Sequence, residues 1–295
     1  MRTKMPRVSI AMPAYNCANF IAQSIESLLS QTYGDFEFVI SDNASTDDTE
    51  TVCRHYAKLD SRIRYIRRTE NIGGPENFRY VFSLCSGEYH KWSTADDYWH
   101  KDFLAKSVAV LDQHPDVVLC YPKTRIINME GRPISDYEDN LNLDDPSPRR
   151  RFCDLLDRIG LCNAHLGLIR REPMARTRLI ARHMASDIDF LAELTLYGKF
   201  TLLPEILFFR RFHPTSSSWA RTNDEHQVQY YDPGRTTNYA MHTWQKYWHL
   251  ATSVWRAPIG TTDKLTLSVE VARRARYARI ALGRELKARL LARKA

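Results

Sequence analysis

Short apolar segments alternate with segments of helical periodicity over residues 7–121, and this alternation constrains the fold most. The apolar segments are short and are bounded by polar or turn-forming residues, as buried strands are; they are residues 7–12, 36–41, 62–67, 89–93 and 117–121. Between them, apolar residues recur every three or four positions, which predicts helices over residues 19–32, 48–59, 76–86 and 102–113. The chain therefore predicts an α/β fold with a mostly parallel central sheet and helices on both faces.

The pattern changes after about residue 130. Residues 131–150 are rich in Pro, Asp and Arg and predict a long loop. Beyond them we expect helices over 150–159 and 187–197, short strands over 166–169, 200–203 and 206–210, and helical, aromatic sequence from about 222. We therefore expect an α/β domain over residues 1–218, with halves 1–125 and 126–218, and a helical C-terminal region over 219–295.

Positive charge is concentrated at the C-terminus. The net charge is +7, yet residues 273–295 hold nine Lys or Arg and one acid, Glu285, so the rest of the chain is close to neutral. This distribution disfavours a nucleic-acid groove on the body. An apolar stripe at helical spacing runs through the same region: Val271, Ala275, Ala278, Leu282, Leu286 and Leu290. The tail predicts a basic amphipathic helix that contacts an anionic membrane surface. The alternatives are a helix that packs on the body with a solvated basic face or is frayed, and a contact with nucleic acid.

Cysteine usage and the N-terminus indicate a compartment. The six cysteines contain no CxxC pair, which favours reduced thiols over disulfides or a structural zinc site. No apolar run approaches the roughly 18 residues of a membrane-spanning helix, and the segment before Pro13 does not resemble a cleaved signal. We expect a cytoplasmic protein, peripheral on the inner face of the cytoplasmic membrane.

Carboxylates follow the predicted strands. Asp96 and Asp97 come directly after residues 89–93, where adjacent acids repel unless a cation neutralises them. Oxygen ligands suit Mg²⁺ or Mn²⁺, whereas a solvated turn with one Asp capping the next helix is the simpler interpretation. Asp42 directly follows residues 36–41. It can accept a hydrogen bond from a nucleotide base or ribose, or form an Asx turn. Tyr15 can stack on a base or pack within its loop.

A second pair of acids, Asp187 and Asp189, opens the helix predicted over 187–197. One of them can act as a general base in a closed crevice, or both can serve as N-terminal helix residues. The sequence holds no GxGxxG, GxxxxGK[ST], GxSxG or HExxH motif. Dinucleotide, phosphate-loop and serine-nucleophile chemistry therefore lack their usual signatures, as does the zinc-protease class.

Taken together, these segments resemble family 2 glycosyltransferases. Residues 8–49 (VSIAMPAYNCANFIAQSIESLLSQTYGDFEFVISDNASTDDT) resemble the opening of that family, and residues 71–104 (NIGGPENFRYVFSLCSGEYHKWSTADDYWHKDFL) resemble its next block. The combined match covers about residues 5–120. Shorter matches are residues 184–200 (MASDIDFLAELTLYGKF), which resemble the segment that supplies the catalytic base, and 210–216 (RRFHPTS), which resemble a basic, His-containing loop near the donor.

The resemblance implies a GT-A fold and inverting transfer of a sugar from a nucleotide diphosphate donor, UDP- or dTDP-linked. The acceptor would be a hydroxyl of a glycan or lipid-linked molecule in surface polysaccharide synthesis, with Mn²⁺ or Mg²⁺ as cofactor. It implies a nucleotide-sugar site formed by Pro13, Ala14, Tyr15, Asp42, Asn43, Asn77, Thr94, Ala95, Asp96 and Arg211. The metal ligands would be Asp96, then Asp97, with His213; the base would be Asp187, with Asp189 as the alternative.

The chain departs from the family in its metal motif, which usually reads Asp-x-Asp-Asp and here reads Thr94-Ala95-Asp96-Asp97. A degenerate, non-catalytic membrane-associated binding module is therefore one alternative. A sugar nucleotidyltransferase is the other, although it would more naturally carry a Gly-rich loop after the first strand, which PAYNCAN is not.

Overall fold

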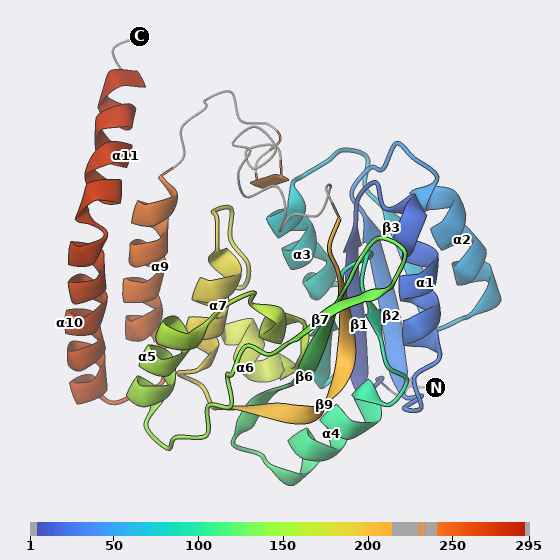
Figure 1. Cartoon of the computed structure of the whole chain (residues 1–295), viewed down its shortest axis with the longest axis horizontal. Coiled ribbons are helices and arrows are strands. Elements are labelled where there is room, and N and C mark those ends of the chain that lie inside the picture. Colours follow the sequence, from blue (N-terminus) through green and yellow to red (C-terminus); the bar gives the residue numbers. More distant parts are fainter. Residues whose placement is uncertain (1–4, 214–229, 232, 234–240, 293–295) are drawn as a thin grey trace.

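The structure is a computed structural model that describes residues 5–213, 230, 231, 233 and 241–292. Within these residues, nine strands form one sheet with the order β3-β2-β1-β4-β8-β6-β9-β5, and β7 pairs with β6 (Figure 1). The N-terminal half supplies four parallel strands: β1 (Val8–Ala14), β2 (Phe36–Asp42), β3 (Ile63–Arg67) and β4 (Tyr89–Trp92). The α/β fold and the alternation expected over residues 7–121 are confirmed.

Four helices connect these strands and the next one: α1 (Ala18–Leu29), α2 (Thr49–Leu59), α3 (Gly74–Ser83) and α4 (Phe103–Gln113). Each buries one face, because its apolar residues recur at helical spacing. In α1 that face consists of Ile21, Ile25 and Leu28, all fully buried. Strands β2 and β3 lie on one side of β1, and β4 lies on the other side. Ligands of open α/β sheets bind beyond the strand ends at such a reversal of strand order.

The second half of the sheet is mixed. Strand β6 (Val117–Ile127) pairs in parallel with β9 (Lys199–Arg211) and antiparallel with β7 (Pro133–Tyr137) and β8 (Leu168–Arg170), while β5 (Tyr98–Trp99) pairs antiparallel with β9. Two expectations are wrong here. Residues 131–150 are not one loop, because they contain β7 and the start of a helix, and residues 200–203 and 206–210 are one strand. A register shift opposite Pro122 and Lys123 accompanies the interruption that suggested two strands.

Short helices cover the second half of the sheet. They are α5 (Pro148–Arg158), the 3₁₀ helix η1 (Asn163–Leu166), α6 (Arg171–Arg176) and α7 (Ser186–Leu194). Ser147 caps α5 by accepting a hydrogen bond from the Arg150 backbone N–H, and Pro148 fits the first turn because its missing N–H would have no partner there.

Three C-terminal helices follow: α9 (His242–Arg256), α10 (Thr261–Tyr277) and α11 (Arg279–Ala292). α9 packs against α7, α10 against α5 and α9, and α11 follows α10 along the upper part of α9 (Figure 1). The prediction of a single amphipathic tail helix is therefore wrong, since Ala278 separates α10 from α11. Val271 is buried whereas Leu286 and Leu290 are exposed, so the expected stripe does not face one partner. None of the helices in the described part of the chain has the length and apolar composition needed to cross a membrane. The helical sequence expected between 222 and 241 lies largely outside the described residues.

One hydrophobic core runs through the described structure. It begins with the sheet residues of β1 and β2, continues through Phe190 and Leu191 of α7, and includes Leu250 and Val254 of α9 and Leu267 of α10. All six cysteines are free thiols. The C-terminal helices therefore share their apolar interior with the α/β part.

Candidate donor and catalytic site

The loops after β1, β2 and β4 lie at one edge of the sheet. In the β1–β2 ladder Ala14 is the register partner of Asp42, and in the β1–β4 ladder Ala11 is the partner of Trp92. The Ser24 hydroxyl of α1 donates to the Thr94 carbonyl at 2.9 Å and so anchors the third loop beside the first. Tyr15, just beyond β1, is 44% exposed and available to stack on a ring; Pro13 is half-buried and Ala14 is buried.

Asp42 is fully buried and its carboxylate has partners inside the protein. One oxygen accepts from the Ser45 backbone N–H at 2.9 Å, and the other accepts from the Tyr65 hydroxyl at 2.6 Å, with Arg67 Nε at 3.8 Å. These contacts match the turn-forming role considered for Asp42 from the sequence. Contact with a base would require this carboxylate to share or exchange those partners.

The two asparagines of the predicted donor site also brace loops. Asn43 donates to Asn71 Oδ1 at 2.7 Å and accepts from the Ile72 backbone N–H at 3.0 Å, which holds the NIGG turn against β2. Asn77 donates to the Ser41 carbonyl at 2.8 Å and accepts from the Ser41 hydroxyl at 2.6 Å, and these two hydrogen bonds join α3 to β2. Both residues therefore shape the edge of the site.

Asp97 supports from inside the loop of residues 93–97, which carries the predicted metal motif and which we call the metal-motif loop. It is buried, and it accepts from the Arg211 backbone N–H at 2.7 Å and from the Thr94 hydroxyl. Burial, and next the neighbouring charge of Asp96, raise the pKa of Asp97 to about 7. Thr94 thus acts as a donor to Asp97. Ala95 is buried beside it.

Asp96 is the more accessible acid of the pair, with 26% of its side chain exposed. His213 Nε2 lies 3.0 Å from its Oδ2, and His213 in turn packs against the Phe20 ring. A carboxylate oxygen and an imidazole nitrogen at this separation fit the donor set of Mn²⁺ or Mg²⁺, Mn²⁺ accepting the nitrogen more readily. Asp97, enclosed by its two donors, is less suited to reach an ion.

Arg211 holds this loop in place. Its guanidinium donates to the carbonyls of Asp96 at 3.0 Å, Asn128 at 3.0 Å and Met129 at 2.5 Å, and to Gln23 Oε1 at 2.5 Å. An arginine with these partners is an anchor between β9 and the metal-motif loop. The role expected for it, contact with the donor diphosphate, would require it to leave at least one of them.

The two acids of α7 have different surroundings. Asp189 is buried and its Oδ2 lies 2.7 Å from His183 Nε2, while the His183 ring meets the His249 ring of α9 at 4.6 Å. Burial raises the pKa of Asp189. These contacts attach α7 to α9. Asp187, by contrast, is half-buried in the first turn of α7, so it is the more accessible of the two.

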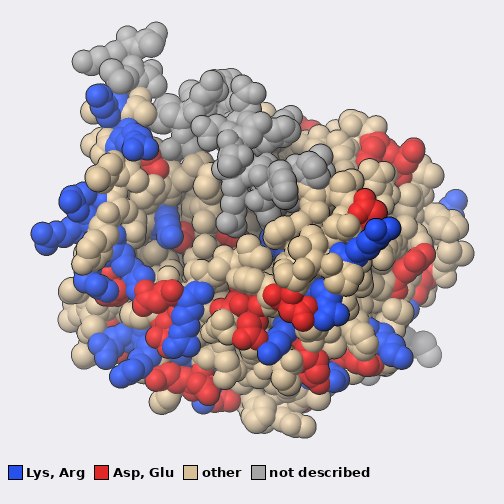
Figure 2. Space-filling model, in the orientation of Figure 1, with Lys and Arg blue, Asp and Glu red and all other residues tan. Residues whose placement is uncertain are grey.

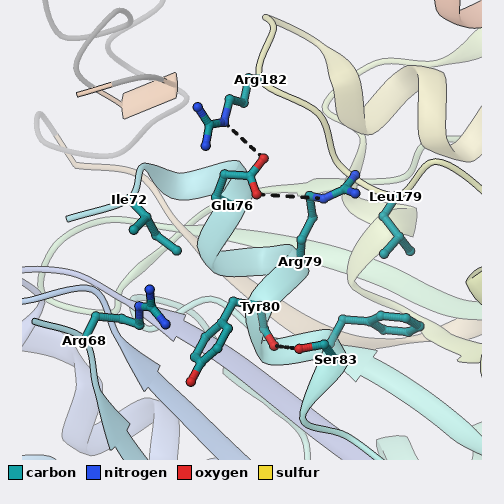
Figure 3. A pocket seen from close by; sticks show the side chains of 9 residues that line it. Arg68, Ile72, Glu76, Arg79, Tyr80, Ser83, Leu179 and Arg182 are labelled. Carbon is teal, nitrogen blue, oxygen red and sulfur yellow. Dashed lines mark hydrogen bonds and ion pairs between the residues drawn. The ribbon is translucent and has the colours of Figure 1, made fainter. Parts of the chain in front are cut away.

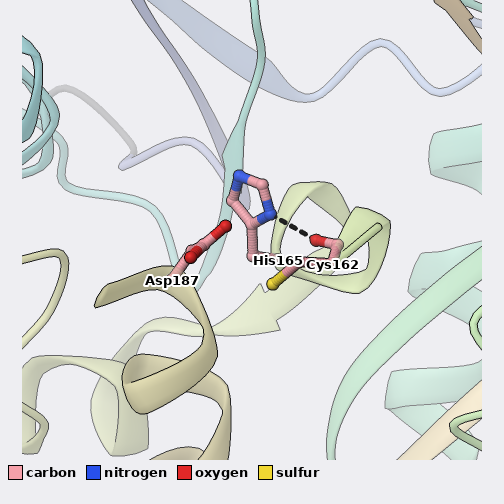
Figure 4. Close-up of side chains that lie close together, drawn as sticks. All are labelled: Cys162, His165 and Asp187. Carbon is pink, nitrogen blue, oxygen red and sulfur yellow. Dashed lines mark hydrogen bonds between the residues drawn. The ribbon is translucent and has the colours of Figure 1, made fainter. Parts of the chain in front are cut away.

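Asp187 has two neighbours that the sequence did not single out, Cys162 and His165 (Figure 4). One ligand atom from each of the three residues lies within 4.8 Å of the others. His165 Nδ1 lies 2.5 Å from the Cys162 carbonyl, which can only accept, so that nitrogen carries the proton. Burial lowers the pKa of His165 despite the nearby Asp187. Because the segment around η1 is irregular, no periodicity marked these residues.

Tyr230 lies near the predicted site. The residue is 38% exposed, but its hydroxyl end packs on Gly74, where an added Cβ would lie 2.5 Å from the ring. Loss of water around the hydroxyl raises the pKa of Tyr230 most, followed by Tyr231 and then by the carboxylates of Asp187 and Asp96. Both acids thus lie within electrostatic reach of one phenol, at the N-terminus of α3. The sequence alone did not place Tyr230 here.

A hollow of about 550 Å³ lies between α3 and the segment before α7 (Figure 3). Arg68, Arg79 and Arg182 line it with one acid, Glu76, which pairs with Arg182 at 3.0 Å and with Arg79 at 4.0 Å. Arg68 lies over the Tyr80 ring at 4.4 Å. The excess of positive charge suits an anionic group.

A parallel half-sheet with a strand reversal and acids beyond its carboxyl edge is an arrangement in which α/β proteins bind ligands. The chain matches the model of Glycosyl transferase family 2 over residues 9–176, more than half of its length, and belongs to that family. An uncharacterized protein of Mycobacterium tuberculosis is 35% identical over 211 residues, which are 70% of this chain and 59% of that protein. Chondroitin synthase of Escherichia coli is 33% identical over 134 residues, 45% of this chain and 19% of that one.

Solved structures share the fold. TarS of S. aureus in complex with UDP-GlcNAc has a TM-score of 0.63 at 17% identity and covers 90% of this chain and 71% of its own. A Pyrobaculum calidifontis mannosyltransferase with GDP-Man and Mn²⁺ has a TM-score of 0.54 at 18% identity and covers 96% and 85%. The GT-A fold expected from the resemblance is therefore confirmed.

Proposed function

We propose that this protein is an inverting glycosyltransferase that moves a sugar from a nucleotide diphosphate donor to an acceptor hydroxyl. Membership of Glycosyl transferase family 2 supports the transferase class. The observation that carries the assignment of roles is the pairing of an accessible Asp96 with His213, together with an accessible Asp187 whose charge, like that of Asp96, acts on Tyr230.

The donor is UDP- or dTDP-linked in this proposal, and the structural neighbour with bound UDP-GlcNAc favours UDP. Tyr15 would stack on the base, and the loops of Asp42 and Asn43 would border it. The diphosphate would lie toward Asp96, because Thr94 and Asp97 hold that loop at the strand reversal.

Asp96 and His213 would hold Mn²⁺ or Mg²⁺, and the mannosyltransferase neighbour with Mn²⁺ supports a metal-dependent reaction. The ion supplies positive charge against the phosphates of the leaving nucleoside diphosphate. Asp97 would keep Asp96 in place and remain outside the coordination.

Asp187 would act as the general base. The acceptor oxygen forms a bond to the anomeric carbon while the bond from that carbon to the diphosphate oxygen breaks, and the acceptor proton passes to Asp187. The nucleoside diphosphate leaves with the bonding electrons, and a single displacement inverts the anomeric configuration. Asp189 supports α7 through His183 and does not exchange the proton.

The acceptor in this proposal is a glycan or lipid-linked molecule of surface polysaccharide synthesis, and the similarity to chondroitin synthase supports a polysaccharide. We place it between α3 and the segment before α7, where the arginine-lined hollow lies. The protein would work in the cytoplasm, peripherally on the inner face of the membrane, with the basic residues of 273–295 facing anionic lipids. The sugar-nucleotide donor and this acceptor are its partners, and nucleic acid is not.

Single substitutions of the two acids test these roles. Asp96→Asn and Asp187→Asn should each lower transfer from a UDP-sugar by roughly 10²-fold or more, the usual scale for a lost catalytic group. With the unchanged protein, UDP should raise the melting temperature more when Mn²⁺ is present. Asp96→Asn should abolish this extra stabilisation by Mn²⁺, whereas Asp187→Asn should retain it. Asp136→Asn, at an exposed position of β7, is the matched control. Near-normal turnover of Asp187→Asn would remove that residue from the mechanism.

A further inference from the structure

Three tryptophans of α9 form a row on the molecular surface. Trp244, Trp248 and Trp255 are 42%, 66% and 54% exposed. With 3.6 residues per turn, positions four and eleven residues apart fall within about 40° of each other around a helix. The three indole rings therefore share one narrow face of α9, which we call the tryptophan row.

The row is held outward by the packing of α9. Leu250 and Val254 are buried on another face of the same helix. Tyr247 donates to the Arg274 carbonyl of α10 at 3.0 Å, and Trp244 Nε1 donates to the Leu282 carbonyl of α11 at 3.0 Å. Because these bonds fix the rotation of α9, the row cannot turn inward without losing them.

Exposed apolar side chains are concentrated on the three C-terminal helices. Of the fifteen large hydrophobic residues exposed in the described part of the chain, nine belong to α9, α10 and α11. On α10, Leu265 and Val269 are one helical turn apart and are 56% and 70% exposed. Soluble surfaces rarely gather such residues without a binding role.

The same helices carry positive charge. Arg276, Arg279, Arg284 and Lys287 are exposed on α10 and α11, and basic side chains follow these two helices along one edge of the molecule (Figure 2). Two of the acids on these helices are engaged: Glu270 pairs with Arg273 and Arg274, and Glu285 accepts from the backbone N–H groups of Thr243 and Trp244. The third, Asp263, lies in the first turn of α10. The C-terminal helices therefore expose both apolar and basic side chains.

We propose that the tryptophan row enters the headgroup region of an anionic bilayer, with the basic residues of α10 and α11 contacting lipid phosphates. Indole rings favour the membrane interface because each combines a broad apolar ring with one N–H donor. The arginines and lysines interleaved with the apolar residues fit a lipid surface better than a second copy of the chain, since the cores of protein interfaces are depleted of charge. The inference rests on the proposed membrane-proximal role and moves its main contact from the tail to α9.

Vesicle binding by the full-length protein tests this surface. Trp248→Ser/Trp255→Ser leaves the Trp244–Leu282 bond intact, and Leu59→Ser at a 68% exposed position of α2 is the matched control. On phosphatidylglycerol vesicles the affinity of the double variant should be lower by a factor of roughly ten or more, as expected when partial burial of two large side chains is lost. The control should bind like the unchanged protein. Binding of the unchanged protein should weaken on phosphatidylcholine and at high salt.

Two measurements separate the outcomes. Tryptophan emission of the unchanged protein should shift to the blue on anionic vesicles, and the double variant should lose most of that shift. Equal vesicle affinity of the double variant and the control would overturn the proposal. A change of oligomeric state in the double variant without a change in vesicle affinity would also overturn it and assign the row to a second copy. Asp187→Asn should bind vesicles normally, so failure of the catalytic proposal remains distinguishable.

Discussion

At the scale of single residues, Thr94 shows how a neutral side chain supports a buried acid. Its hydroxyl donates to the buried Asp97. An acid in that position would place a second negative charge beside an enclosed carboxylate whose pKa is already raised to about 7. The metal-motif loop therefore leaves Asp96 accessible beside His213 and keeps Asp97 as an internal support.

The sequence could identify these residues more readily than their partners. Asp96 and Asp187 follow recognisable segments, and their accessible positions agree with the roles predicted for them. The inward turn of Asp42 depends on Tyr65 and Arg67 from the next strand, and Arg211 depends on carbonyls more than 80 residues away. Such long-range hydrogen bonds leave no local pattern. Cys162, His165 and Tyr230 were not predicted for the same reason.

His90 offers a test of burial on this scale. It is fully buried in β4, packs against the rings of Phe82 and Trp92, and neither ring nitrogen has a partner within the described structure. Burial, and then the charges of Arg171 and Lys91, lower its pKa to about 3. Unfolded His90 takes up a proton below about pH 6.5, whereas the folded residue does so only near pH 3. Stability should therefore fall as the pH drops from about 6.5 to about 3.

His90→Phe should remove this dependence, because phenylalanine does not titrate. Relative to the unchanged protein, the variant should gain on the order of 1 kcal/mol of unfolding free energy for each pH unit within that window. Denaturant unfolding at pH 7, 6 and 5 measures it, with exposed His55→Phe as the comparison. Parallel stability curves for His90→Phe and the unchanged protein would contradict the expectation.

At the scale of helices and strands, predictability follows burial. The strands β1, β2 and β4 are almost wholly buried, and their apolar runs are visible in the sequence. Strand β7 is an edge strand whose residues are nearly all exposed, so no apolar pattern marks it, and β5 is only two residues long. The break between α10 and α11 at Ala278 has no Gly or Pro to signal it.

The N-terminus of α9 depends on a residue of another helix. Both carboxylate oxygens of Glu285 accept hydrogen bonds there, from the backbone N–H of Thr243 at 2.9 Å and of Trp244 at 3.2 Å. A carboxylate in this position satisfies donors that α9 itself cannot and complements the positive end of its dipole. Glu285→Ala should therefore destabilise α9 and α11 by about 1 kcal/mol.

Hydrogen exchange measures this effect directly. Amides in the first turn of α9 and in α11 should exchange faster in Glu285→Ala, while those of β1 and β2 should be unchanged. Lys287→Ala, at an exposed position of the same helix, is the control. Equal protection of α9 in both variants would show that the cap does not hold the two helices together.

At the scale of the whole molecule, one continuous hydrophobic core extends across the domain boundary expected at residue 218. Leu250, Val254 and Leu267 from the C-terminal helices join the same buried cluster as Phe190 and Leu191 of α7. The His183–Asp189 pair and the His249 ring lie across the junction between α7 and α9. Sequence composition showed the change from α/β to helical sequence, but it could not show that both parts share one interior.

We therefore expect one unfolding transition. Calorimetry should give a single peak whose calorimetric and van't Hoff enthalpies agree. A chain ending after residue 218 should lose several kcal/mol, since it would expose the apolar surface that α9 and α10 cover. Two separate transitions, or a truncated chain with unchanged melting temperature, would show that the C-terminal helices fold as an independent domain.

The attachment of α7 to α9 has a consequence for the reach of the enzyme. α9 carries His249 on the side toward α7 and the tryptophans along another side, and the row follows the length of the helix instead of its tip. In the proposed membrane contact α9 would lie flat on the lipid surface, and its thickness of about 10 Å would set the spacing between the headgroups and the first turn of α7, which holds Asp187. Acceptors with a short linker between lipid and sugar would match that spacing, and long, freely extended chains would gain nothing from it.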